Sequence, residues 1–131
     1  MTASTVDHTW TENATGSHLE AHTGDFAVDA VRQGPVDRVR VRGELDMATA
    51  PLLGGVLDGV YGHRPDQVEI DLSGVTFVDT QGLTMLVAAH RGLAGRGGRL
   101  VLRDPSPVAA RVLALTRFDR YFDVEAGVRN E

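Results

Sequence analysis

The residues with the clearest chemical potential are Asp79, Thr80 and Gln81, in the run DLSGVTFVDTQGLTML of residues 71–86, where a strand-like pattern passes into a helix-like one. The first turn of a helix has free backbone N–H groups and a positive local field, so it favours carboxylates and phosphates. Asp79 is therefore predicted to cap this helix. Thr80 would be its first residue, and a phosphate on the Thr80 hydroxyl would add about two negative charges to a nearly neutral, partly apolar surface. Such a modification would switch off a protein interface at this point.

Strand and helix patterns on either side must position this junction. Residues 26–32 and 36–43 alternate apolar and polar side chains, which predicts an antiparallel hairpin. Further strands are predicted at residues 67–72, 100–104 and 121–124. Helices are predicted to begin after Thr49, after Asp79 and at Ser106. The order β-β-α-β-α-β-α-β indicates an α/β fold with a mixed, mostly parallel sheet, an N-terminal hairpin and helices packed mainly on one face.

The chain of 131 residues is expected to form a single domain at residues 26–124, with a flexible N-terminal tail at 1–25 and a C-terminal tail at 125–131. The first 25 residues show no hydrophobic period of either kind. They include His8, His18 and His22, but the spacing of these histidines defines no metal geometry, so we expect no metal site. Without a secretory signal or an apolar run of membrane-spanning length, the protein is expected to be cytoplasmic and not to bind a membrane.

The composition argues against several classes of function. The thirteen basic residues are all arginine, and the lack of lysine argues against a P-loop and a receiver-type phosphorylation site. Cysteine is absent, which excludes thiolate nucleophiles and disulfides. Residues 26–124 balance twelve arginines with twelve acids, so no nucleic-acid surface is predicted. The run GLAGRGGR precedes a strand instead of following one, which is wrong for a dinucleotide loop, so we expect no cofactor and no enzyme.

Two motifs make residues 26–124 similar to the STAS domain of bacterial anti-sigma factor antagonists. The first is Gly43-Glu44-Leu45-Asp46 followed by ATAPLL, and the second is DLSGVTFVDTQGL, in the same order and at the same separation as in that family. The resemblance implies a protein that regulates transcription by partner switching. Such a protein binds an anti-sigma factor that is also a serine/threonine kinase, and thereby frees a sigma factor. The kinase phosphorylates a Ser or Thr at the N-terminus of the helix, a phosphatase removes the phosphate, and the antagonist itself catalyses nothing.

The motif carries over to this chain residue by residue, with one departure. Asp79 matches the family's acidic residue and Gly82 its glycine, so the two hydroxyl positions between them fall on Thr80 and Gln81. The family's acceptor is often the residue directly before the glycine, where the amide of Gln81 cannot accept a phosphoryl group. Thr80 remains an acceptor candidate, although its side chain is rotated by roughly 100° about the helix axis from the usual position. The protein therefore either switches through Thr80 or has lost the switch and binds constitutively.

The same helix supplies most of the expected partner surface. A small and apolar stripe that includes Met85, Ala88 and Gly92 is interpreted as the outward side of the helix, although packing under a loop would explain Met85 and Ala88 as well. Asp46 is either a partner contact, as the resemblance implies, or a local turn residue. The full set of expected partner-binding residues is Asp46, Asp79, Thr80, Gln81, Gly82, Thr84, Met85 and Ala88.

Two other functions stay open at this point. A STAS module can serve as a scaffold, or as a subunit of a transport or stress-signalling complex, without phosphorylation. An enzyme or a small-molecule sensor is the third class, although no nucleophile elbow and no His-Glu metal pair occurs in the sequence. His90 falls on the apolar side of its helix, and we assign it no role.

Overall fold

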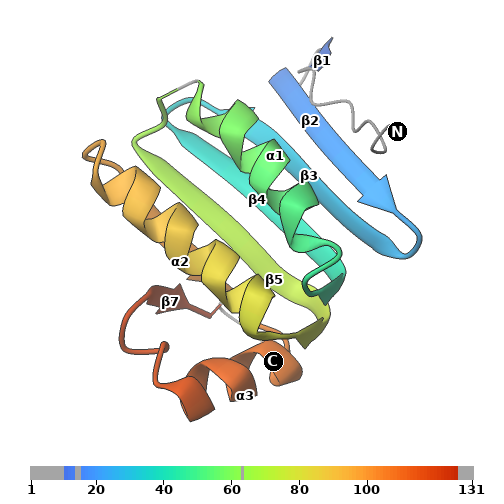
Figure 1. Cartoon of the computed structure of the whole chain (residues 1–131). Helices are drawn as coiled ribbons and strands as arrows, with labels where there is room; N and C mark the ends of the chain where they lie inside the picture. The colour runs from blue at the N-terminus through green and yellow to red at the C-terminus, as the bar shows by residue number, and fades with distance from the viewer. Residues whose placement is uncertain (1–10, 14–15, 63, 127–131) are drawn as a thin grey trace, which may run out of the picture.

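The computed structural model describes residues 11–13, 16–62 and 64–126 of the chain. Three helices and seven strands occur in this described part (Figure 1). The strands are β1 (Thr11–Asn13), β2 (Gly16–Thr23), β3 (Phe26–Gln33), β4 (Val36–Leu45), β5 (Gln67–Val78), β6 (Arg99–Arg103) and β7 (Asp123–Glu125). The helices are α1 (Ala50–Tyr61), α2 (Thr80–Ala94) and α3 (Pro107–Thr116).

The strands of the described residues form one sheet in sequence order, from β1 to β7. Strands β1 to β4 pair antiparallel, whereas β4, β5, β6 and β7 pair parallel and are joined through α1, α2 and α3. The predicted α/β class, the mixed sheet and the hairpin made by β3 and β4 are confirmed. Because α1 and α2 both return the chain for a parallel strand, they run in the same direction, and their N-termini lie at one end of the molecule (Figure 1).

The predicted flexible tail at residues 1–25 is wrong for residues 16–23. These residues form β2, which pairs along its length with β3. Leu19 and Ala21 of β2 are buried in the hydrophobic core, and α1 packs across this strand. At the other end of the chain, Glu125 belongs to β7, so the predicted domain boundary at residue 124 falls inside the last strand.

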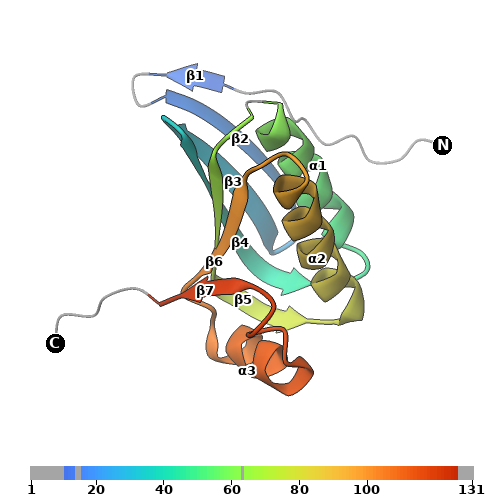
Figure 2. The same ribbon diagram turned by 90° about the vertical axis from the view of Figure 1, so that its left-hand side faces the viewer.

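Alternate residues of the strands build the core under the helices. Figure 2 shows α1 and α2 side by side on one face of the sheet. Helix α1 packs on β2 and β3, α2 packs on β6 and on α1, and α3 packs against β5. The central strands send Val39, Val41, Val68 and Ile70 into this layer, and none of these side chains is exposed by more than 1%. The prediction that the helices lie mainly on one face is therefore confirmed.

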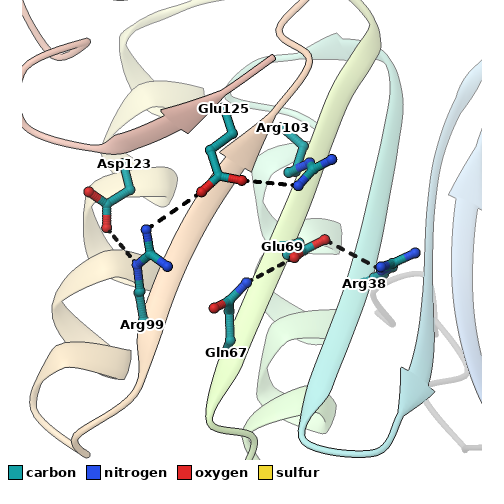
Figure 3. A network of polar contacts seen from close by, with 7 residues as sticks. All are labelled: Arg38, Gln67, Glu69, Arg99, Arg103, Asp123 and Glu125. Atoms are coloured by element: carbon teal, nitrogen blue, oxygen red, sulfur yellow. Dashed lines mark hydrogen bonds and ion pairs between the residues drawn. The ribbon is translucent and has the colours of Figure 1, made fainter. Parts of the chain in front are cut away.

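The opposite face of the sheet carries paired charges (Figure 3). Arg99 Nε lies 3.0 Å from Asp123 Oδ2, and Arg103 Nη1 lies 3.0 Å from Glu125 Oε1. These pairs join Asp123 and Glu125 of β7 to β6, although ion pairs this exposed stabilise a fold by less than about 1 kcal/mol each. Glu69 of β5 accepts a hydrogen bond from Gln67 and forms an ion pair with Arg38 of β4. The polar side of β4, which consists of Arg38, Arg40 and Arg42, thus lies on a solvated sheet face.

Candidate functional site

Asp79 joins the start of α2 to the loop between β4 and α1. Its backbone is extended, and its Oδ1 atom accepts a hydrogen bond from Gly82 N at 2.9 Å, so it caps α2 as predicted. Its second carboxylate oxygen, Oδ2, accepts from Met47 N at 3.1 Å. The backbone N–H of Asp79 also donates to the Leu45 carbonyl. One residue therefore determines how the α2 N-terminus and the residues after β4 lie relative to each other.

The loop after β4 is folded by Asp46 and Thr49. Asp46 Oδ1 accepts hydrogen bonds from Ala48 N at 3.0 Å and Thr49 N at 3.1 Å, which makes a tight local turn. The Thr49 hydroxyl donates to the Glu44 carbonyl at 2.6 Å and accepts from Asp46 N. Thr49 is the residue before α1, as predicted, but its hydroxyl makes no capping bond to that helix. The carboxylate of Asp46 thus has a structural use in its own turn, which leaves its partner contact a prediction.

Gly82 allows α2 to begin directly against β4. A Cβ atom built on Gly82 would lie 2.8 Å from Leu45 Cγ and closer still to the Leu45 carbonyl oxygen. Only a residue without a side chain fits this approach. The predicted role of Gly82 in partner binding is untested, but its packing role follows from these contacts.

The polar side chains of the first turns of α2 face solvent. Thr80, Gln81 and Thr84 are all exposed. The Thr84 hydroxyl donates to the Thr80 carbonyl at 2.8 Å, which occupies it within the helix. Thr80 is the first residue of α2, at the end of the helix where free N–H groups favour a phosphate. Thr80 is therefore an exposed residue at a helix N-terminus, and its phosphorylation stays a prediction.

The small and apolar stripe of α2 faces α1, so its interpretation as an outward surface is wrong for Met85 and Gly92. A Cβ on Gly54 of α1 would lie 3.0 Å from Met85 Cε, and a Cβ on Gly92 would lie 3.7 Å from the Tyr61 hydroxyl. Tyr61 also donates a hydrogen bond to the Ala89 carbonyl of α2 at 3.3 Å, and its burial raises the pKa of the phenol. Helices that cover the same sheet face must touch along their sides, and small residues permit this contact.

A shallow hollow remains between the two helices. It has a volume of about 510 Å³ and is lined in part by Met85, Ala88, Gly55 and Asp58. Ala88 is exposed and Met85 is half-buried, so both still present some surface beside the hollow. Their contact with a partner remains a prediction.

Two exposed apolar residues near Asp79 were missed by the sequence reasoning. The side chain of Met47 is 71% exposed, and Phe77, two residues before Asp79, is 47% exposed. Phe77 pairs in register with Glu44 of β4, which is also exposed. We call Met47, Thr80 and Gln81 the α2 N-terminal surface. A large exposed apolar side chain beside a helix terminus can contribute to a protein contact site. In the sequence, the only indication of an exposed Met47 is that it directly follows Gly43-Glu44-Leu45-Asp46.

The residues that the structure describes offer no centre for a metal ion. They contain no group of three or more His, Cys, Asp or Glu side chains placed to hold one. Of the three histidines considered, His18 and His22 lie on β2, and His8 lies outside the described residues. Within the same residues, no helix is long and apolar enough to cross a membrane.

The described part of the chain is thus an α/β domain with a mixed sheet, helices mainly on one face and an exposed, capped helix N-terminus. A family model described as "Mlab, STAS domain" matches residues 27–126. The chain therefore belongs to the STAS domain family, as the two motifs predicted. A crystal structure of an anti-sigma factor antagonist from Mycobacterium paratuberculosis is 31% identical, with 76% of this chain and 85% of that chain covered and a TM-score of 0.69.

Two more distant structures share the fold. One is a sulfate transporter family protein from Wolinella succinogenes, which is 23% identical, with 72% of this chain and 80% of that chain covered and a TM-score of 0.63. The other is the Bacillus cell fate determinant SpoIIAA in its phosphorylated form, which is 17% identical, with 79% of this chain and 92% of that chain covered and a TM-score of 0.61. At these identities, the likeness supports the architecture alone.

Proposed function

We propose that this protein is an anti-sigma factor antagonist, which binds a serine/threonine-kinase-type anti-sigma factor and thereby frees a sigma factor. The observation that carries the proposal is the double hydrogen bond of Asp79, which holds Met47 and the first turn of α2 together as one exposed surface. The similarity to the mycobacterial antagonist supports the same function. The protein acts by binding, in the cytoplasm, and neither a cofactor nor nucleic acid takes part.

The chemistry of the α2 N-terminal surface indicates what the partner presents. Met47 supplies apolar area that a partner pocket would cover. Glu44 and Asp46 bring negative charge close to this apolar area, and Asp79 adds a third carboxylate. A partner with an apolar pocket would cover this area and leave the neighbouring carboxylates in water at the edge of the contact.

Regulation of the binding has two alternatives. Thr80 is exposed, and phosphorylation there would add about two negative charges to a partly apolar contact, where the cost of removing water from the phosphate would oppose binding. A phosphatase would then restore the binding form. In the alternative, the replacement of a hydroxyl residue by Gln81 has removed regulation by phosphorylation, and the protein binds its partner constitutively.

Incubation with the kinase-type anti-sigma factor and MgATP, followed by mass-spectrometric mapping, separates these alternatives. Phosphate at Thr80 that disappears in Thr80→Ala, but not in Thr84→Ala, would establish the switch. Thr84 is a matched control because it is also exposed and lies one turn further along the same helix. Stable binding without any phosphate on α2 would instead establish constitutive binding.

The antagonist function itself is tested by the affinity for that anti-sigma factor. Gln81→Asp adds a charge to the α2 N-terminal surface, and we expect it to weaken binding by about tenfold or more. If no kinase-type anti-sigma factor binds at micromolar concentration, the proposed function is wrong.

A second candidate function is that of a scaffold or subunit, without phosphorylation, in a transport or stress-signalling complex. The description of the matching family model and the fold shared with a sulfate transporter family protein are consistent with this second function. Co-purification with transporter subunits, and dependence on them for solubility, would support it over the antagonist.

A further inference from the structure

Helix α3 has an outer face on which apolar and basic side chains occur together. Leu115 is 75% exposed and Val108 is 41% exposed. These residues are seven positions apart, about two helical turns, so both lie on one side of the helix. Arg111 lies between them at the matching spacing and is exposed as well. We call Val108, Arg111 and Leu115 the α3 surface.

The described part of the chain leaves this surface uncovered. Helix α3 packs against β5 with Ala109 and Leu113, which are buried on its inner side. In Figure 2, α3 lies at the lower end of the molecule, well away from α1. The Ser106 hydroxyl caps its first turn by accepting from Ala109 N at 3.1 Å, so the helix is anchored at its start. The helix is therefore held in place with Val108, Arg111 and Leu115 together on its solvent side.

The charge near the α3 surface is positive, although the chain as a whole has a formal net charge of −5. Arg111, Arg117 and Arg120 are exposed in this segment, against one exposed acid, Asp119. The acids of the following strand, Asp123 and Glu125, are already paired with arginines of β6. The segment from α3 to β7 therefore has an excess of unpaired positive charge among the described residues.

We propose that the α3 surface is a second docking site, whose occupant is a different protein with an apolar groove and an acidic rim. An apolar groove would cover Val108 and Leu115, while acids on its edge would meet Arg111 and the arginines that follow α3. A lipid surface fits less well, because α3 exposes only two large apolar side chains and an arginine stands between them.

A second copy of this chain fits less well too. Two α3 surfaces placed face to face would bring arginines together, which opposes a two-fold dimer. Contact between an α3 surface and the acidic α2 N-terminal surface of another copy would join two different patches, and such contacts extend into open chains unless the rotation closes. The α3 surface can bind a separate protein whether or not α2 binds an anti-sigma factor.

Photo-cross-linking tests this docking site. The photoreactive residue p-benzoylphenylalanine replaces Leu115 in the full chain, the protein is expressed in its native cells, and adducts formed under ultraviolet light are mapped by mass spectrometry. We expect an adduct with one protein, at a site lined by apolar and acidic residues. An adduct only with a second copy, only with lipid, or with nothing would overturn the proposal.

A purified complex with the captured protein then supplies the quantitative criterion. Leu115→Ser and Arg111→Glu should each weaken binding by about tenfold or more, and the affinity should fall with rising salt. Met47→Ser is the matched control, because it removes an equally exposed apolar side chain from the other surface and should leave the affinity within about twofold. Both α3 variants change exposed residues, so unfolding curves should match wild type. Equal affinity of the α3 variants and wild type would overturn the proposal.

Discussion

Replacement of Gly82 by Ala is expected to destabilise the fold where α2 begins. The new Cβ would lie 2.8 Å from Leu45 Cγ and closer to the Leu45 carbonyl oxygen. Leu45 is fully buried, and its carbonyl accepts a hydrogen bond from Asp79 N, so this backbone cannot move away without loss of that bond. Overpacking of this severity costs about 3 kcal/mol. The higher helix propensity of Ala offsets about 1 kcal/mol, which leaves a net loss of about 2 kcal/mol.

Gly92→Ala is the matched control for Gly82→Ala, because both glycines belong to α2. A Cβ on Gly92 would be in ordinary contact, 3.7 Å from the Tyr61 hydroxyl, so this variant should gain up to about 1 kcal/mol from helix propensity. Thermal and urea unfolding followed by circular dichroism measure both changes. We expect the Tm to fall by about 6–10 °C for Gly82→Ala and to rise by a few degrees for Gly92→Ala. A Gly82→Ala variant as stable as wild type would refute the packing between α2 and β4.

Three further predictions follow from single contacts. Asp79→Ala removes both hydrogen bonds of the cap and should lower the free energy of unfolding by about 1–2 kcal/mol, while Asp79→Asn should lose less in the same urea titration. Burial, followed by the charge of Asp58, raises the pKa of Tyr61, so ultraviolet titration should show a late phenolate that is absent in Tyr61→Phe. Because the folded chain holds this proton more tightly, the associated stability is complete below about pH 10 and is lost as the pH rises through the raised pKa. Asp123→Ala breaks only an exposed ion pair with Arg99 and should change the unfolding free energy by less than about 1 kcal/mol, a difference that should shrink in high salt.

The sequence predicts the central elements well because their local patterns and their tertiary positions agree. The alternating residues of β4 and the cap at Asp79 each satisfy a local rule that the fold also uses. Strand β2 was missed because only Leu19 and Ala21 mark its buried side, which is too short a pattern to predict a strand. Pairing with β3 and cover from α1 make it a strand, and neither is visible in the local sequence.

The sequence predicts the parts of the candidate site that follow from local patterns, and it misses the parts that depend on contacts between distant residues. The spacing of the motif identifies Asp79 as a cap, but the hydrogen bond from Met47 N joins residues 32 positions apart, and no local pattern contains it. The predicted outward orientation of Met85 is wrong because the sequence pattern of one helix shows only that one of its sides is small and apolar. Whether that side meets solvent or a neighbouring helix depends on α1, which supplies Gly54 at the contact.

The central claim, that the α2 N-terminal surface binds a kinase-type anti-sigma factor, is tested most directly by quantitative affinity capture from native cells. Wild type, Gln81→Asp and Leu115→Ser serve as baits, and the bound proteins are quantified by mass spectrometry. We predict that wild type and Leu115→Ser capture a kinase-type anti-sigma factor and that Gln81→Asp loses it. Capture of transporter subunits without such a kinase, or equal capture of the kinase by all three baits, would contradict the claim.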